Sequence, residues 1–261
     1  FLDANFEKVF IAIGLFLCIF LITAQIVNRY LLPFIEIVNM TTWTEELARY
    51  IFIWISYLGA SFAIKKRETI QIDTFKGLFP ITFSRALNVT NPLVMIIICY
   101  IVSEKGINII LQQLQSGQTS PAIGLPMAIP YLAVPVGFIL MGIRLIQNLL
   151  SDIREMKKHE IALGLIVTII LILPVFFLEN VSSAIILFVY FAIFIVIGMP
   201  IAFALGAATL GTTIATQSIP LQFFSQASFT SIDNFPIMAV PLFIAAGIIM
   251  GGGDLIKRLL K

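Results

Sequence analysis

Acidic and basic side chains gather near residue 45, where a long apolar run begins. Glu45 and Glu46 precede Arg49 by four and three residues, so on a helix their opposite charges lie within salt-bridge reach. Thr42 and Glu45 have capping-box spacing, which predicts that a helix begins here. The chemistry available to this cluster is ion pairing at a helix start. Two roles follow from that chemistry: coupling between parts of the protein, or simple anchoring of a helix at a membrane interface.

The other reactive residue types do not have the spacing of a catalytic or metal site. His159 is the only histidine, and Cys18 and Cys99 fall inside apolar runs, where a thiol behaves as a small hydrophobe. The sequence has no zinc-type cluster, no nucleophile elbow and no phosphate-loop glycine spacing. We therefore expect neither an enzyme nor a metal site, and the net charge of +2 gives no reason to expect a nucleic-acid partner.

The composition is that of a membrane protein. Hydrophobic residues make up 59% of the 261 and charged residues 11%, with a mean hydropathy of +1.04, whereas soluble domains have about 45–50% and 25%. We predict an all-α fold, a polytopic transmembrane helical bundle, in which Gly59 and Ala63 make a close helix contact. Runs of spanning length cover residues 9–27, 47–64, 86–110, a fourth stretch that ends near Asn148, and 161–178.

Basic residues are distributed unevenly between the loops, which predicts an orientation. The segment 65–85 contains five basic residues and the segment 144–158 contains four, whereas 111–128 contains none. Because basic loops stay in the cytoplasm, we predict that the N-terminus and the segments 65–85 and 151–160 are cytoplasmic. The segments 29–46 and 111–128 are then extracytoplasmic.

The apolar run at 184–215 is too long for one simple crossing. Its 32 residues would form a helix of roughly 48 Å at 1.5 Å per residue, against a bilayer core of about 30 Å. We predict a kink or tight reversal at 198–200, where proline lacks a donor beside a flexible glycine. A single, steeply tilted helix is the alternative.

The sequence closes with an amphipathic pattern. Three glycines precede residues 254–261, whose apolar and basic side chains separate onto two sides of a helix. We predict a helix in the cytoplasmic interface, which requires the 184–215 run to cross twice. A terminal polar tail is the alternative.

The segment from Trp43 to Asp73 resembles the small membrane subunit of tripartite ATP-independent periplasmic (TRAP) transporters. That subunit carries Trp-Ser/Thr-Glu-Glu, a basic residue, a glycine midway and a basic turn ending in Asp. Thr69 departs from the family, in which His often follows the acid of the turn, so no role of that imidazole is carried over. The matching residues here are Trp43, Thr44, Glu45, Glu46, Arg49, Gly59, Lys65 to Arg67 and Asp73.

A second set of motifs resembles the start of the large TRAP subunit. Residues 198–206, with Gly198 and Pro200, follow its Gly-Val-Pro-Ile-Ala-Phe-Ala-Leu-Gly, and residues 231–247, with Pro236 and Pro241, follow its Asp-Ser-Phe-Pro run. The resemblance implies a small-subunit-like four-helix domain at 1–158, a fusion transmembrane helix at 159–181, and an N-terminal scaffold part of the large subunit at 182–261. The structural or coupling candidates are Trp43, Glu45, Glu46, Arg49, Gly59, Arg67, Asp73, Gly198, Pro200, Pro236 and Pro241.

The resemblance implies a function as the permease component of a secondary transporter in the bacterial inner membrane. Such transporters are driven by a sodium gradient and supplied by a soluble extracytoplasmic binding protein. The family holds sodium and substrate in re-entrant hairpins of the large subunit, so we expect no metal or substrate residue in this chain. We expect it to be one part of a longer assembly, with the remainder of the large subunit and membrane lipids as partners.

The expected substrate is an organic acid. Several fused members of the family take up sialic acid, which makes sialic acid the expected cargo and a C4-dicarboxylate the alternative. A non-transporting membrane assembly subunit is the competing class, suggested by the lack of buried charge pairs deep in the predicted spans.

Overall fold

The computed structural model describes residues 2–31, 40–71, 77, 79–178, 181–217 and 219–252. These residues form helices and no strands, which confirms the predicted all-α fold. The one β-type contact among them is an isolated bridge between Thr119 and Pro126. Asp73 and the amphipathic segment at 254–261 lie outside the described residues.

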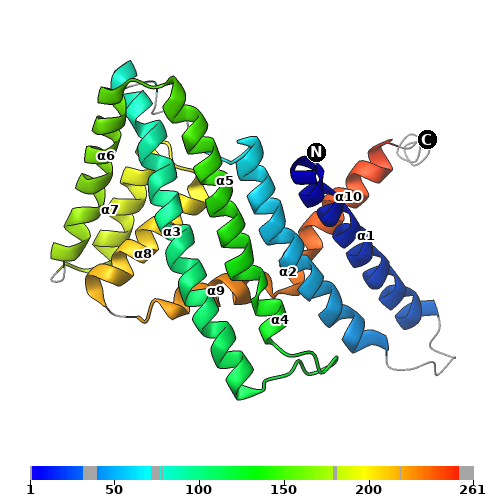
Figure 1. The fold of residues 1–261 in the computed structure, drawn as a ribbon. Coiled ribbons are helices and arrows are strands. Elements are labelled where there is room, and N and C mark those ends of the chain that lie inside the picture. Colours follow the sequence, from blue (N-terminus) through cyan, green and yellow to red (C-terminus); the bar gives the residue numbers. More distant parts are fainter. Residues whose placement is uncertain are drawn as a thin grey trace.

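Figure 1 shows the arrangement of the helices. Within the described residues five helical stretches are long and apolar enough to cross a membrane, and the bent pair α9 and α10 would make a sixth span. The helices are α1 (Leu2–Leu31), α2 (Met40–Lys66), α3 (Ile81–Ser116), α4 (Ala128–Tyr131), α5 (Ala133–Glu155), α6 (Lys158–Ile172) with the 3-10 turn Leu173–Phe177, α7 (Ser183–Val196), α8 (Ile201–Thr216), α9 (Gln222–Ile232) and α10 (Phe235–Gly252).

Several helix boundaries differ from the prediction. Helix α2 begins at Met40, so Thr42 lies inside the helix and the predicted capping box is wrong. Helix α3 continues to Ser116 and ends where Gly117 adopts a left-handed φ of 62°. Helix α5 continues to Glu155, well past Asn148, because polar side chains in its last turns bond to α2, as described below.

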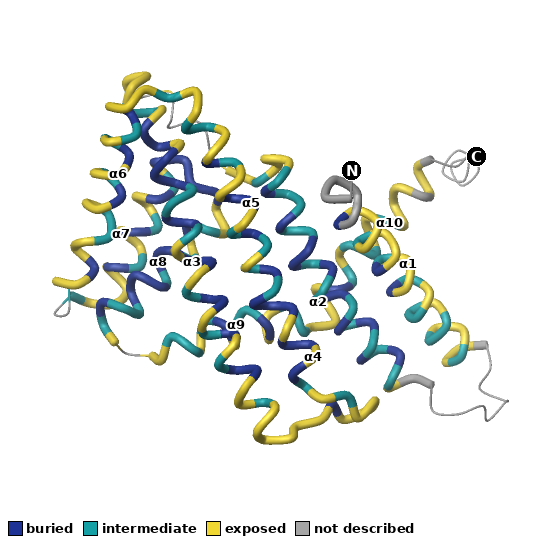
Figure 2. The backbone as a smooth tube through the Cα atoms, viewed as in Figure 1, coloured by how far each residue is buried: buried dark blue, intermediate teal, exposed yellow. Residues whose placement is uncertain are grey.

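Helices α2, α3 and α5 form the centre of the bundle. Figure 2 shows much buried backbone on these helices and on α8, whereas α1 and α6 are largely exposed or half-buried. We call the end where α2 and α5 finish and α3 and α6 begin the basic end, since Lys65, Lys66, Arg85 and Arg154 lie there. Helix α9 runs across the long helices, and α10 then turns back toward the basic end (Figure 1).

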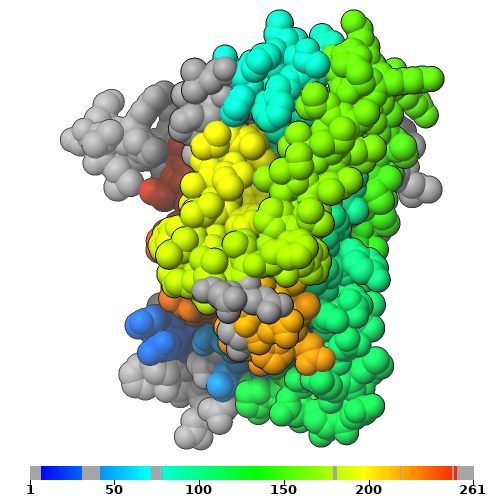
Figure 3. Space-filling model, turned by 90° about the vertical axis from the view of Figure 1, so that its left-hand side faces the viewer, coloured from blue at the N-terminus to red at the C-terminus, as the bar shows by residue number. Residues whose placement is uncertain are grey.

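Helix α6 packs closely on α3, where the sequence predicts a fusion helix. A Cβ atom at Gly164 would lie 2.8 Å from the carbonyl oxygen of Ala86, so only glycine allows this approach. Thr90 donates to the Gly164 carbonyl at 3.1 Å. At the basic end Arg85 pairs with the buried Glu160 at 3.2 Å. Figure 3 shows α6 and α7 covering this side of the molecule.

Helices α7 and α8 form a hairpin, which confirms the predicted break and excludes the single tilted helix. The chain reverses at Gly198, whose φ of 74° is left-handed, and Pro200 precedes the first residue of α8. The helices contain 14 and 16 residues, so they are roughly 21 and 24 Å long at 1.5 Å per residue. Each is shorter than a bilayer core of about 30 Å, so neither by itself reaches fully across.

Candidate functional site

The structure places several of the predicted residues, among them Arg49, Gly198 and Pro200, where two helical units meet. We call α1–α5 the first unit and α7–α10 the second unit, with α6 connecting them. The units contact each other at the tip of the α7–α8 hairpin, near the basic end, and along α9 and the start of α10. These contacts form one extended junction, which we treat as the candidate functional site.

Glu46 is buried and fully engaged within the first unit. Its Oε2 accepts hydrogen bonds from the backbone N–H groups of Ala122 at 2.9 Å and Ile123 at 3.0 Å. Its Oε1 accepts from the Tyr50 hydroxyl at 2.8 Å. A buried carboxylate is tolerated only when such donors replace water. Glu46 therefore ties the first half of α2 to the loop between α3 and α4.

Arg49 pairs with the second unit rather than with its own helix. Its Nη1 lies 3.7 Å from Asp233 Oδ1, so the predicted pairing with Glu45 or Glu46 is wrong. Glu46 is already occupied by backbone donors, which leaves Arg49 free to turn toward α9. Asp233 lies at the break between α9 and α10, where the chain bends by 50°. The ion pair thus connects α2 to this bend.

Two prolines, Pro236 and Pro241, follow the same bend. Pro236 is the second residue of α10 and Pro241 is inside that helix. A proline near a helix start is compatible with the missing donors there, whereas one in the interior leaves a carbonyl without its partner.

Trp43 and Glu45 line an open cavity of about 370 Å³ beside Arg49 and the loop at 121–122.

Helix α9 is fastened across three elements of the first unit. The Tyr57 hydroxyl of α2 donates to the Ser228 carbonyl at 2.8 Å, and Ser225 donates to the Val102 carbonyl of α3 at 2.7 Å. Tyr131 of α4 stacks on Phe229, with ring centroids 3.8 Å apart. An apolar cavity of about 500 Å³, lined in part by Tyr57 and Ser228, lies between α2, α5 and α8.

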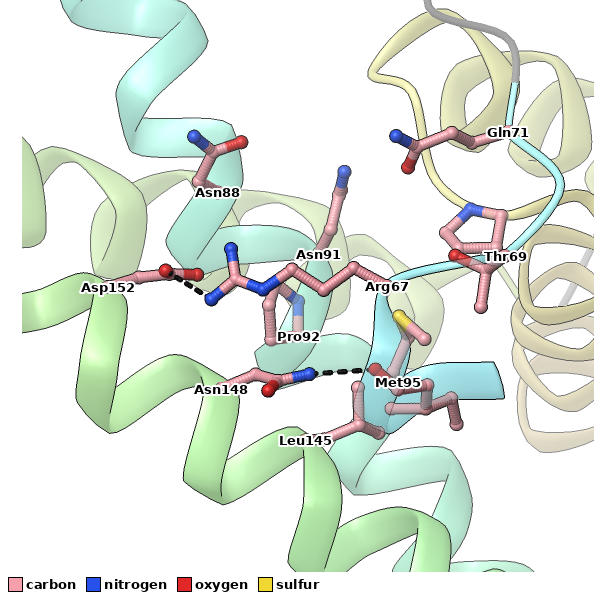
Figure 4. Close-up of a pocket in the computed structure, with 12 residues that line it drawn as sticks. Arg67, Thr69, Gln71, Asn88, Asn91, Pro92, Met95, Leu145, Asn148 and Asp152 are labelled. Atoms are coloured by element: carbon pink, nitrogen blue, oxygen red, sulfur yellow. Dashed lines mark hydrogen bonds and ion pairs between the residues drawn. The ribbon is translucent and has the colours of Figure 1, made fainter. Parts of the chain in front are cut away.

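A polar pocket of about 230 Å³ lies at the basic end, beside the hairpin tip. Figure 4 shows Thr69 and Gln71 on one side of it and Asn88 and Asn91 of α3 on the other. Asn91 is buried, and its side-chain amide donates to the Ile197 carbonyl at 3.2 Å. Asn91 therefore fixes the end of α7 to α3.

The segment after α2 also contacts the hairpin. The backbone N–H of Ile201 donates to the Ile70 carbonyl at 3.1 Å, and Pro200 lines the pocket. Arg67 ends α2 with a left-handed φ of 59°, and the bonds from Arg67 N–H to Ile64 and from Glu68 N–H to Ala63 form a Schellman motif. The basic turn at Lys65 to Arg67, which resembles that of the small TRAP subunit, is therefore the end of α2, and it directs the chain toward α8.

Two polar residues of α5 hold this helix end in place. Arg67 Nη2 lies 2.6 Å from Asp152 Oδ1, and Asn148 donates to the Ile64 carbonyl at 2.9 Å (Figure 4). Residues four apart lie on one helix face, so Asn148 and Asp152 reach α2 together. Sequence reasoning missed both, because it ended this helix near Asn148 and assigned 151–160 to a cytoplasmic segment.

The predicted close contact at Gly59 is wrong. A Cβ atom built on Gly59 would meet nothing within 4 Å. The close approaches occur at other glycines: Gly14 lies against Ile55, Gly137 against Tyr57, and Gly164 against α3. Spacing of small residues alone does not say which helix face has a neighbour.

A buried charge pair was also missed by sequence reasoning. Glu7 is 3% exposed and Arg144 is 6% exposed, and Arg144 Nη2 lies 3.0 Å from Glu7 Oε1. Glu7 lies just before the predicted run at 9–27 and is the first residue of the spanning stretch Glu7–Tyr30. The available signal was Arg144, an ionisable residue within an apolar run, which rarely lacks a partner.

The fold and the junction define the class of protein: a helical membrane protein with two helical units in one chain. Residues 18–155 match the family described as tripartite ATP-independent periplasmic transporters, DctQ component. Residues 188–261 match the family described as tripartite ATP-independent periplasmic transporter, DctM component. The chain therefore belongs to the TRAP transporter family, with a DctQ component followed by a DctM component, which confirms the resemblance.

Similar curated proteins carry the same family name. The chain is 43% identical over 261 residues to the isethionate TRAP transporter permease protein DctMQ of Oleidesulfovibrio alaskensis, covering 100% of this chain and 41% of the relative. It is 27% identical over 261 residues to the sialic acid TRAP transporter permease protein SiaT of Haemophilus influenzae, covering 94% and 41%. It is 28% identical over 120 residues to the C4-dicarboxylate TRAP transporter small permease protein DctQ of Rhodobacter capsulatus, covering 45% and 53%. The chain thus spans about two fifths of the length of the first two permeases.

Proposed function

We propose that this chain supplies the scaffold of a TRAP permease that imports an organic acid delivered by a soluble binding protein. The observation that carries the proposal is the junction itself. The first unit contacts the second at the hairpin tip, along α9 and at the α9–α10 bend. Asn91 and Tyr57 make hydrogen bonds and Arg49 makes an ion pair at these three places. A scaffold must keep its helices in a fixed arrangement while other parts of the transporter move.

The proposed orientation places the basic end in the cytoplasm. The basic residues of the short segments at 65–85 and 144–158 favour that side. The N-terminus is then cytoplasmic, and the end with Trp43, Glu45 and the loop at 117–127 faces outward, where a soluble binding protein would dock. The protein would lie in the bacterial inner membrane.

The proposed energy source is a sodium gradient, with the ions bound by segments of the large subunit outside this chain. The proposed cargo is a small organic anion. The relative with 43% identity over the whole chain is named for isethionate, whereas the relative named for sialic acid has 27% identity. We therefore rank isethionate first for testing, sialic acid second and a C4-dicarboxylate third.

The proposal is tested by uptake into proteoliposomes. The complete permease that contains this chain is reconstituted with its binding protein, and entry of radiolabelled isethionate, sialic acid and succinate is measured with and without an inward sodium gradient. The proposal expects uptake of one of these anions only when both the binding protein and the gradient are present. Equal uptake with and without the binding protein, or no uptake of any of the three anions, would refute the proposal.

A further inference from the structure

The Glu7–Arg144 pair connects residues 137 positions apart and is buried inside the first unit. Glu7 Oε1 accepts from Arg144 Nε at 3.2 Å and from Nη2 at 3.0 Å, and Ser61 of α2 donates to the same oxygen at 3.4 Å. Arg144 Nη1 donates to Gln147 at 2.9 Å. One carboxylate oxygen thus joins α1, α2 and α5.

Helix α1 has little else to hold it against α5. It packs along α2, and among the described elements no other helix makes comparably extensive contact with it. Its buried residues Glu7, Gly14 and Cys18 lie on one narrow stripe, at spacings of seven and four residues. Phe16 and Phe20 on the other side are 67% and 60% exposed, as suits a helix that faces lipid.

The stripe of α1 also contributes to the place where the second unit packs. Cys18 of α1, Ala48, Phe52 and Ile55 of α2, and Met238 of α10 form one cluster of buried residues, separate from the main core. Cys18 and Met238 are each 1% exposed. We call this cluster the α10 seat. Helix α1 forms one wall of the α10 seat, so its position affects the second unit.

We propose that Glu7 and Arg144 are positioning residues, which fix α1 against α5 and thereby complete the α10 seat. An ion in an apolar interior is tolerated because its partner and hydrogen bonds replace water, so removal of the Arg144 guanidinium leaves the Glu7 carboxylate buried without its opposite charge. Glu7 Oε2 is buried and has no hydrogen-bond partner among the described residues, so compensation of this charge rests on the bonds to Oε1.

The buried cysteine provides a reporter of the position of α1. In the complete permease carrying Cys99→Ala, Cys18 is labelled with N-ethylmaleimide in isolated membranes, and its rate of modification is measured. Arg144→Gln should raise that rate about 100-fold, the factor expected from breaking a buried ion pair. Arg154→Gln, an exposed position of the same helix, is the matched control and should change it by about twofold at most.

The double variant separates charge pairing from side-chain packing. Glu7→Gln with Arg144→Gln removes the carboxylate that Arg144→Gln leaves without its opposite charge, so Cys18 should react at least about tenfold more slowly than in Arg144→Gln alone. If only the packing of these side chains mattered, the double variant would react as fast as Arg144→Gln or faster. Arg144→Gln with the rate of the parent protein, or a double variant as reactive as Arg144→Gln, overturns the proposal.

A second reporter tests the α10 seat itself. Met238→Cys in a background of Cys18→Ala and Cys99→Ala should show the same order of labelling rates across these variants. Unchanged labelling at residue 238, together with faster labelling of Cys18, would show that α10 packs independently of α1 and would overturn the positioning role. If Arg144→Gln does not accumulate in membranes, accumulation of the double variant supports the proposal and its absence refutes it. None of these outcomes depends on uptake, so the proposed function is tested separately.

Discussion

Removal of either partner of the Arg49–Asp233 pair should destabilise the junction between the two units. At their separation of 3.7 Å, two unit charges attract by about 4.5 kcal/mol at an effective dielectric constant of about 20. Desolvation offsets part of this attraction, and the side chains are 28% and 23% exposed. An exposed pair contributes about 0–1 kcal/mol and loss of one partner from a buried pair costs about 3–5 kcal/mol. For this half-buried pair we expect about 2 kcal/mol per single variant.

The assay is a double-mutant cycle on the purified permease. Arg49→Gln and Asp233→Asn should each lower the midpoint of thermal unfolding of the whole permease by about 1–2 °C. The double variant should lose about as much as one single variant, because the interaction can be lost only once, giving a coupling energy of about 2 kcal/mol.

Glu45→Gln is the matched control, because Glu45 lies on the same turn of α2 and lines the neighbouring cavity. It should leave the midpoint of thermal unfolding unchanged. Losses that add in the double variant to within about 0.5 kcal/mol would show that the two side chains act independently. An equal loss in Glu45→Gln would trace the effect to the helix start rather than to the ion pair. Either result would refute the reasoning.

Gly164→Leu should displace α6 from α3 and lower stability by about 3 kcal/mol, whereas Gly59→Leu should stay within about 0.5 kcal/mol of the parent protein. The midpoints of thermal unfolding compare the two variants, and equal losses of stability would contradict the packing described at these glycines. Glu46→Gln should weaken the anchor of the loop at 117–127 by about 1–2 kcal/mol, measured as faster amide hydrogen exchange in that loop, and unchanged protection would count against the anchor. Asn91→Leu should free the hairpin tip at a loss of about 1 kcal/mol, measured as faster proteolysis at residues 197–200; no change there would mean that the tip is held by other contacts.

Much of the local structure of this protein follows from its sequence. The apolar runs predict the long helices because the bilayer fixes the length of a span. The break at Gly198 and Pro200 is predictable because a missing donor and a left-handed φ are properties of those residues themselves. Family membership is likewise readable, since the motifs at 43–73 and 198–247 are continuous stretches of chain.

The pairing of charged groups was decided by tertiary structure. Spacing on one helix makes Glu45 and Glu46 the apparent partners of Arg49, yet backbone donors from a loop occupy Glu46 and Asp233 arrives from another helix. Local spacing specifies which partners are possible, whereas the fold determines which of them come close enough.

The choice between equivalent helix faces was also decided only by packing. Gly59 and Gly164 are both glycines within apolar helices, but only Gly164 has a neighbouring backbone against it. Glu7 and Arg144 meet although 137 positions separate them, because α1 and α5 both pack beside α2. A sequence determines the local conformations of its residues, but contacts between distant residues depend on how helices pack around one another, and small shifts there decide which side chains meet.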